Sequence, residues 1–249
     1  ERGWEEFDEE VQQEGDWNLY WRTSGFRNSD YENILPWQRL NHHPKVTHVT
    51  RKDYLVRHLR RMKCAFGATL YGFSPSTFIL PNEYTKFLGV YTKNHSSRYW
   101  ICKPVDLSRG LVRSATENYT LASLHNLYSH LTNTSINRFG LCYAMDKERV
   151  GKGCKWTLSQ FRCFLHKQDV NELLLWHKIS NIVTLTLLKA VPCIPSSPNC
   201  LELLCFDILI DSSYKPWLLE VNHSPALSVD CAADVTVKKG LIGDFIDLL

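Results

Sequence analysis

The chain has 249 residues, 44% of them hydrophobic, so it is long and apolar enough to form a folded domain with its own core. Its 29 basic and 26 acidic side chains give a formal net charge of +3, too small to make nucleic acid the expected partner. The most apolar segment, residues 182–194, contains a lysine and a proline and is too short to span a bilayer. We therefore expect a globular, monomeric protein that binds neither nucleic acid nor membrane.

The nine cysteines have irregular spacings and form no C-x-x-C pair, which favours reduced thiols over a disulfide framework or a zinc site. The first ten residues are acidic and do not resemble a signal peptide. We interpret the N-x-S/T sequons as chance occurrences. These observations predict a cytoplasmic protein.

Residues 1–45 are rich in tryptophan, asparagine and charge but have little periodicity. We expect an irregular packed arm, because so many aromatic side chains would be poorly placed in water. His42 and His43 are adjacent, so their side chains diverge and they make a poor metal-binding pair.

Residues 50–67 are predicted to form a helix that begins after Thr50 as N-cap and buries Leu55, Leu59 and Met62 on one stripe. Its other face is basic. This face carries Arg57, Arg60, Arg61 and Lys63. It is either a solvated surface or a docking surface for an acidic protein tail.

The remaining elements mix strands and helices without strict alternation. We expect strands at 76–80 and 98–105, then helices at 157–166, 171–190 and 235–249, with two strands between the last two helices. This order favours an α+β fold over a doubly wound sheet.

Two apolar runs, residues 206–211 and 216–222, flank a short polar stretch, and this pattern predicts a β-hairpin. If residues 212–215 form the loop, the register places Asp207 directly opposite Glu220. Alternation then puts Phe206, Ile208, Ile210, Trp217, Leu219 and Val221 on one face, and Asp207, Glu220 and Asn222 on the other.

Two carboxylates opposite one another have β-carbons about 5 Å apart and repel each other, so a positive group is expected between them. Carboxylate and amide oxygens suit Mg²⁺, which usually completes its coordination with water and nucleotide phosphates. The alternative is that Asp207 and Glu220 only line a solvated face or meet nearby lysines. A loop one residue longer or shorter would break the register.

A nucleotide site is suggested by Lys103, which ends an expected strand shortly before the Arg109-Gly110 loop. A lysine and loop N–H groups can bind phosphates. The residues alone thus point to an enzyme that uses ATP and magnesium.

Several motifs occur in the order found in the tubulin tyrosine ligase-like family, which the chain resembles from Asp16 onward. These motifs are "DWNLYW", "TRKD", "WICKPVDLSRG", "LVRSAT", "HLTNTSIN", "GCKWTL", "CFDILID" and "KPWLLEVNHSPAL". The resemblance implies an ATP-grasp-like mixed sheet with flanking helices. It also implies an arm and substrate-side region at 1–90 and a catalytic core at 91–249.

The resemblance further implies roles for individual residues. Those matching ATP contacts are Lys103, Arg109, Gly110, Thr132 and Asn133; those matching substrate contacts are Arg113, Thr134 and Lys155; those matching magnesium ligands are Asp207, Glu220 and Asn222. Of these, Arg109 and Glu220 are the implied catalytic residues.

The implied activity is ATP- and Mg²⁺-dependent addition of free L-glutamate to glutamate side chains in the acidic C-terminal tails of tubulin. This places the protein at the cytoskeleton, with cilium or flagellum as options. Glycine instead of glutamate as the donor remains an alternative.

The chain departs from the family between Gly110 and Leu111, where the segments for the central lid and adenine pocket are missing. Either the printed sequence omits residues that the protein has, or the protein lacks them. In the second case we expect a catalytically inactive relative that still binds tubulin. An unrelated ATP-dependent enzyme with the same hairpin is a third possibility.

Overall fold

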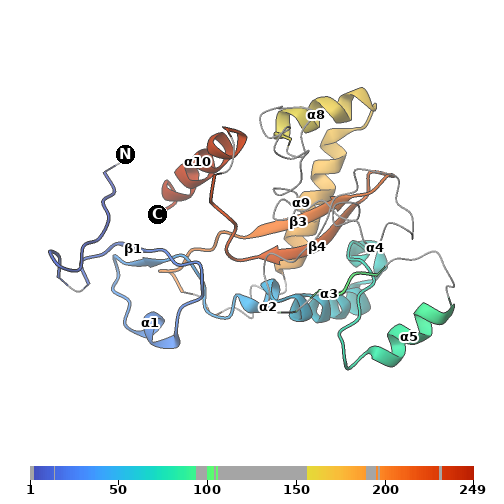
Figure 1. Cartoon of the computed structure of the whole chain (residues 1–249), viewed down its shortest axis with the longest axis horizontal. Helices are drawn as coiled ribbons and strands as arrows, with labels where there is room; N and C mark the ends of the chain where they lie inside the picture. The colour runs from blue at the N-terminus through green and yellow to red at the C-terminus, as the bar shows by residue number, and fades with distance from the viewer. Residues whose placement is uncertain are drawn as a thin grey trace, which may run out of the picture. The chain divides into compact units, whose positions relative to one another are not determined.

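The structure is a computed structural model that describes residues 3–13, 15–93, 100–103, 105, 156–188, 195, 197–229 and 232–249 (Figure 1). Its contacts divide the chain into two compact units. The first unit contains Glu1–Ser96 and Leu175–Ala226, and the second contains Ser97–Leu174 and Leu227–Leu249. The boundary expected near residue 90 stays a prediction.

The first unit combines short helices with two small sheets. It contains β1 (Leu19–Tyr20), α1 (Asn28–Glu32), β2 (Arg39–Leu40), α2 (Thr47–Thr50), α3 (Lys52–Phe66), α4 (Ala68–Tyr71), α5 (Tyr84–Lys93), most of α9 (Glu172–Leu188), β3 (Cys205–Ile210) and β4 (Pro216–Asn222). Strand β1 pairs with β2 in parallel, and β3 pairs with β4 antiparallel. The described residues therefore have the expected α+β character.

The N-terminal arm is packed at residues 38–42, whereas Val11 and Trp37 of the same arm are 81% and 56% exposed, so the prediction is confirmed only in part. Leu40 in β2 is 1% exposed and forms a parallel bridge with Cys200. Its N–H donates to the carbonyl of Asn199 at 2.9 Å, and its own carbonyl accepts from the N–H of Leu201 at 2.9 Å. The arm is thus hydrogen-bonded to the segment that leads into β3.

The core of this unit lies between α3, α4, α9 and the hairpin (Figure 1). Its buried side chains are Leu55, Leu59, Tyr71, Phe73, Ile182, Leu218 and Val221, with Met62 partly buried against them. The predicted stripe on α3 is confirmed. The predicted N-cap is wrong, because Thr50 ends α2 and its hydroxyl donates to the Val46 carbonyl at 3.3 Å, so α3 begins after Arg51.

The strand expected at 76–80 does not form, because its backbone bonds to side chains instead of to another strand. The N–H of Ile79 donates to the Glu83 carboxylate at 2.7 Å, and the Thr77 carbonyl accepts from Arg60. The described residues of the second expected strand, 100–103 and 105, are not in a strand either.

The three expected helices are confirmed as α8 (Leu158–Lys167), α9 and α10 (Ala232–Ile246). The second unit contains α8, α10 and the first turn of α9. Helix α8 begins at a capping box, in which Thr157 Oγ1 accepts from the Gln160 N–H at 3.3 Å. Within the described ranges, no helix has the length and apolar character needed to cross a bilayer.

One buried histidine of α3 should make the first unit sensitive to acid. His58 is 6% exposed, and its Nε2 lies 3.2 Å from the Thr186 carbonyl. Burial lowers the pKa of His58 below 6.5, the Thr186 hydrogen bond raises it, and the charge of Arg61 lowers it, with a net downward shift. The unfolded chain therefore takes up this proton more readily than the folded chain. The stabilisation is complete above about pH 6.5 and is lost as the pH falls through the folded value.

We expect the free energy of unfolding to fall by up to about 1.4 kcal/mol per pH unit in this range because of this one group. Urea unfolding of the wild type and of His58→Gln, compared between about pH 7 and about pH 5, measures the effect. Glutamine keeps a hydrogen-bond donor but does not titrate. Equal acid sensitivity in the two proteins would contradict the assignment.

Candidate metal and nucleotide site

The β3–β4 hairpin brings the three predicted magnesium ligands to its open end. Asp207 in β3 lies opposite Glu220 in β4, as the sequence predicted. Asn222, which pairs with Cys205 at the end of the ladder, donates from its Nδ2 to Asp207 Oδ2 at 3.4 Å. Two carboxylates and an amide therefore meet across two strands.

The predicted register also holds for Phe206 opposite Val221, but between Asp207 and the loop it is wrong by one residue. A β-bulge between Asp207 and Ile208 shifts the pairing, so that Ile208 lies opposite Leu218 and the loop extends over residues 211–215. As a result Leu218 is 2% exposed, whereas Leu219, expected in the core, is 42% exposed. Bulges bend a strand locally and re-aim the side chains beside them.

The hairpin loop is held by Asp211, which was expected only to end the first strand. Its Oδ1 accepts from the N–H of Ser213 and of Lys215, each at 2.9 Å, and from the Ser213 hydroxyl at 2.6 Å. Its Oδ2 accepts from Trp217 Nε1 at 2.8 Å. The hydrogen bonds from Ser213 and Trp217 strongly lower the pKa of Asp211. An aspartate at the start of a short polar loop is the signal for such a turn.

A positive side chain lies beside the opposed carboxylates. Lys52, at the start of α3, places its Nζ 3.6 Å from Glu220 Oε2, and about a quarter of each side chain is exposed. The pair relieves part of the repulsion between Glu220 and Asp207. For Glu220, the structure therefore agrees with the alternative in which the carboxylate forms an ion pair with a nearby lysine.

The thiol of Cys205 is next to the same site, with its Sγ 3.9 Å from Asp207 Oδ1. Burial raises the pKa of this thiol, and the charge of Asp207 raises it further. A protonated thiol is a weak donor and not a metal ligand. The donors left at the open end are the oxygens of Asp207, Glu220 and Asn222, and an all-oxygen set fits a hard cation such as Mg²⁺.

In the part of the chain that the structure describes, no group of three or more His, Cys, Asp or Glu side chains is placed to hold a metal. The hairpin set contains two carboxylates and one amide. Mg²⁺ commonly binds one or two protein carboxylates, so the set matches this preference. Such a site needs further oxygens from phosphates and water.

Of the other predicted site residues, only Lys103 lies within the described ranges. Lys103 is exposed, has no regular secondary structure and belongs to the second unit. Arg109, Gly110, Arg113, Thr132, Asn133, Thr134 and Lys155 lie outside the described residues. The place expected for the missing lid, between 110 and 111, lies outside them as well.

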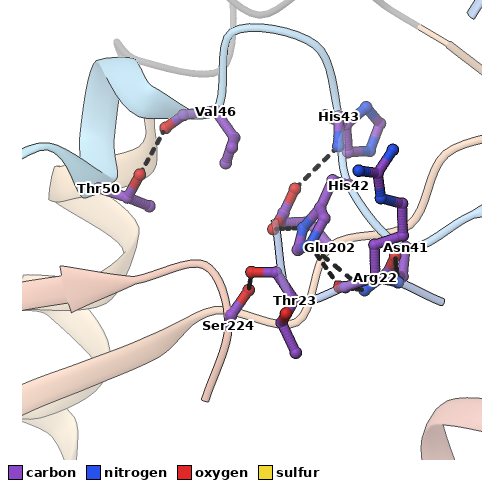
Figure 2. Close-up of polar contacts among 9 residues, drawn as sticks. All are labelled: Arg22, Thr23, Asn41, His42, His43, Val46, Thr50, Glu202 and Ser224. Carbon is purple, nitrogen blue, oxygen red and sulfur yellow. Dashed lines mark hydrogen bonds and ion pairs between the residues drawn. The ribbon is translucent and has the colours of Figure 1, made fainter. Parts of the chain in front are cut away.

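A buried polar cluster next to the hairpin was not predicted. Figure 2 shows His42 and Glu202 pointing toward one another, with Arg22 and Asn41 beside them. The adjacency of His42 and His43 in the sequence indicated only that they make a poor metal-binding pair. The available signals were a histidine near the end of the expected packed arm and a glutamate four residues before the strand expected at 206–211.

Comparison with known proteins places the chain in a family. A model of the tubulin-tyrosine ligase family matches residues 28–111 and 108–248, which together cover nearly the whole chain. The chain belongs to this family. The two matched segments meet at 108–111, where Gly110 is joined to Leu111.

Curated relatives of this family member include two proteins described as probable tubulin polyglutamylase TTLL2. The mouse protein is 45% identical over 311 residues, covering 100% of this chain and 58% of the relative, and the human protein is 44% identical, covering 100% and 52%. Mouse tubulin polyglutamylase TTLL5 is 28% identical, covering 94% and 23%. The chain thus spans just over half the length of the TTLL2 proteins.

Proposed function

We propose that this family member is an ATP- and Mg²⁺-dependent ligase that adds glutamate to glutamate side chains in tubulin C-terminal tails. The observation that carries the proposal is the opposition of Asp207 and Glu220 on the hairpin, with Asn222 hydrogen-bonded to Asp207. The printed descriptions of the relatives as tubulin polyglutamylases support the substrate.

In this proposal Asp207, Glu220 and Asn222 hold the cation, which when bound offsets the negative charge of the triphosphate. Residues Lys103, Arg109, Gly110, Thr132 and Asn133 contact ATP, and Arg109 and Glu220 stabilise the transferred phosphoryl group. Arg113 pairs with the carboxylate of the incoming amino acid, since a guanidinium can bind it with two hydrogen bonds. Thr134 and Lys155 are the neighbouring substrate contacts.

The reaction proceeds in two balanced steps. A γ-carboxylate oxygen of a tail glutamate attacks the γ-phosphorus of ATP, and the bond to ADP breaks, giving an acyl phosphate. The amino group of free glutamate, after losing a proton to solvent, attacks the acyl carbon. The bond from carbon to the phosphate oxygen then breaks, the nitrogen gives up a second proton to the leaving phosphate, and an isopeptide bond remains. Placement of the two substrates in line supplies much of the rate enhancement.

The acidic tail would dock on the basic face of α3. Arg60 on this face is already used structurally, because it donates to Glu83 at 2.6 Å. Arg57 is paired loosely with Asp53 at 3.9 Å and is half exposed. Arg61 and Lys63 are exposed. These last three cations are the ones suited to hold glutamate side chains, and such a role places the protein in the cytoplasm at the cytoskeleton, with the cilium as one option.

A second candidate, an inactive relative that binds tubulin without ATP, is favoured by the break in the family match at 108–111. The alignment with the mouse relative extends over 311 positions, at least 62 more than the 249 residues of this chain (311 minus 249). A chain without the lid should not retain ATP. A titration of the purified protein with a fluorescent ATP analogue separates the two candidates.

The ligase proposal predicts incorporation of labelled glutamate into tubulin that requires both ATP and Mg²⁺. Removing the C-terminal tails by limited proteolysis should abolish the signal, because the acceptor glutamates are gone. Labelled glycine offered in parallel tests the donor and should be incorporated at no more than background. Equal incorporation into tail-cleaved tubulin would rule out the proposed acceptor.

A further inference from the structure

The N-terminal arm contacts both strands of the hairpin at its open end through one buried side chain. His42 is 1% exposed, and its Nδ1 lies 2.9 Å from Glu202 Oε1, three residues before β3 begins. Its ring lies edge-to-face on His223, directly after β4, with centroids 5.3 Å apart. A single residue of the arm therefore touches the entry to β3 and the exit from β4.

The arm holds His42 in place with a dense set of hydrogen bonds (Figure 2). Its Nε2 lies 2.8 Å from the Arg22 carbonyl, which also accepts from Asn41 Nδ2 at 2.7 Å. The side chain of Asn41 completes the pair by accepting from the Arg22 N–H at 2.8 Å. The imidazole consequently has little freedom to rotate or shift.

Glu202 is fixed from a second direction. Its Oε2 accepts from the His43 N–H at 2.8 Å, and its side chain is 8% exposed. Burying a carboxylate is unfavourable unless its oxygens are hydrogen-bonded, so Glu202 is tied to this position. On the β4 side of the same open end, the Ser224 hydroxyl donates to the Thr23 carbonyl at 2.6 Å (Figure 2).

We propose that His42 and Glu202 are positioning residues for the cation site of the hairpin. Asp207 follows Glu202 by five residues, and Asn222 directly precedes His223. His42 therefore fixes the separation of the two chain segments that bear these ligands. Metal affinity depends on such supporting contacts, because ligands held in the wrong geometry must be reordered on binding. The inference rests on the proposed function of the hairpin.

The test measures Mn²⁺ binding by electron paramagnetic resonance, with and without a non-hydrolysable ATP analogue, in the full chain. Mn²⁺ replaces Mg²⁺ as a probe with the same preference for oxygen ligands. We expect His42→Ala and Glu202→Ala to weaken Mn²⁺ binding by about 10- to 100-fold. Glu202→Gln, which can keep one of the two hydrogen bonds, should have a smaller effect and guards against a variant that does not fold.

The control is Leu165→Ala, which removes a buried side chain of α8 that is 0% exposed and is not among the core residues that cluster with the hairpin. It should lower the melting temperature but leave the Mn²⁺ dissociation constant of the folded protein within about two-fold, since it removes none of the contacts that His42 and Glu202 make. A purely structural role for His42 would make its variants resemble this control.

A double-variant comparison makes the inference specific. In an Asp207→Asn background, which lacks one ligand that Glu202 is proposed to position, Glu202→Ala should cause a smaller further loss. If the wild type binds Mn²⁺ and both His42→Ala and Glu202→Ala keep its affinity, the positioning role is overturned but the proposed cation site is not. Absence of Mn²⁺ binding in the wild type would overturn the proposed cation site itself.

Discussion

Glu220→Gln should abolish the ATP-dependent transfer of glutamate to tubulin. Glutamine has nearly the same shape but carries no negative charge, so the variant removes one of the two carboxylates proposed for Mg²⁺. A loss of about 3 kcal/mol in transition-state stabilisation corresponds to a rate decrease of about 100-fold or more. Incorporation of labelled glutamate per minute, at saturating ATP and tubulin, measures the effect, together with the Mn²⁺ dissociation constant.

The structure offers a matched control, because Glu220 also contacts Lys52 at 3.6 Å. Lys52→Met breaks the same ion pair but leaves the carboxylate in place. The pair is partly exposed, so its loss should change the free energy of unfolding by no more than about 1 kcal/mol. We expect Lys52→Met to retain Mn²⁺ binding. If Glu220→Gln transferred glutamate at the wild-type rate, the carboxylate would have no role beyond its contact with lysine.

Leu218→Ala should destabilise the first unit by about 2–5 kcal/mol, the usual cost of truncating a buried leucine. Leu218 is 2% exposed and packs in the core with Leu59 and Val221. Its N–H also donates to the Phe73 carbonyl at 2.8 Å, so this position of β4 is fixed against the segment that follows α4. Thermal unfolding followed by circular dichroism measures the change, and we expect a melting temperature several degrees lower.

Leu219→Ala is the control, since it makes the identical chemical change one residue further along the strand. Leu219 is 42% exposed, and truncating a surface side chain usually changes stability by no more than about 0.5 kcal/mol. Regular alternation from Asp211 and Pro216 would predict the opposite order, with Leu219 the costly position. A larger loss for Leu219→Ala than for Leu218→Ala would therefore contradict the bulge.

The sequence by itself determined the elements whose signals are local. The apolar stripe of α3 and the helix expected at 157–166 each depend on residues that are close in sequence, so pattern and spacing sufficed. The hairpin was predictable for the same reason, because its polar loop limits the registers to a few, and Asp207 does lie opposite Glu220. The motifs spread along the chain also pointed to the correct family.

Only the tertiary structure decided which leucine of β4 is buried and what holds the hairpin ends. The bulge between Asp207 and Ile208 exposes Leu219, and no local pattern distinguishes two adjacent leucines. His42 and Glu202 are 160 residues apart in sequence, so their pairing follows from the path of the arm and not from spacing. Burial makes such long-range contacts necessary, because a buried carboxylate is stable only when it accepts hydrogen bonds. The donors come from whichever segments the fold places beside it.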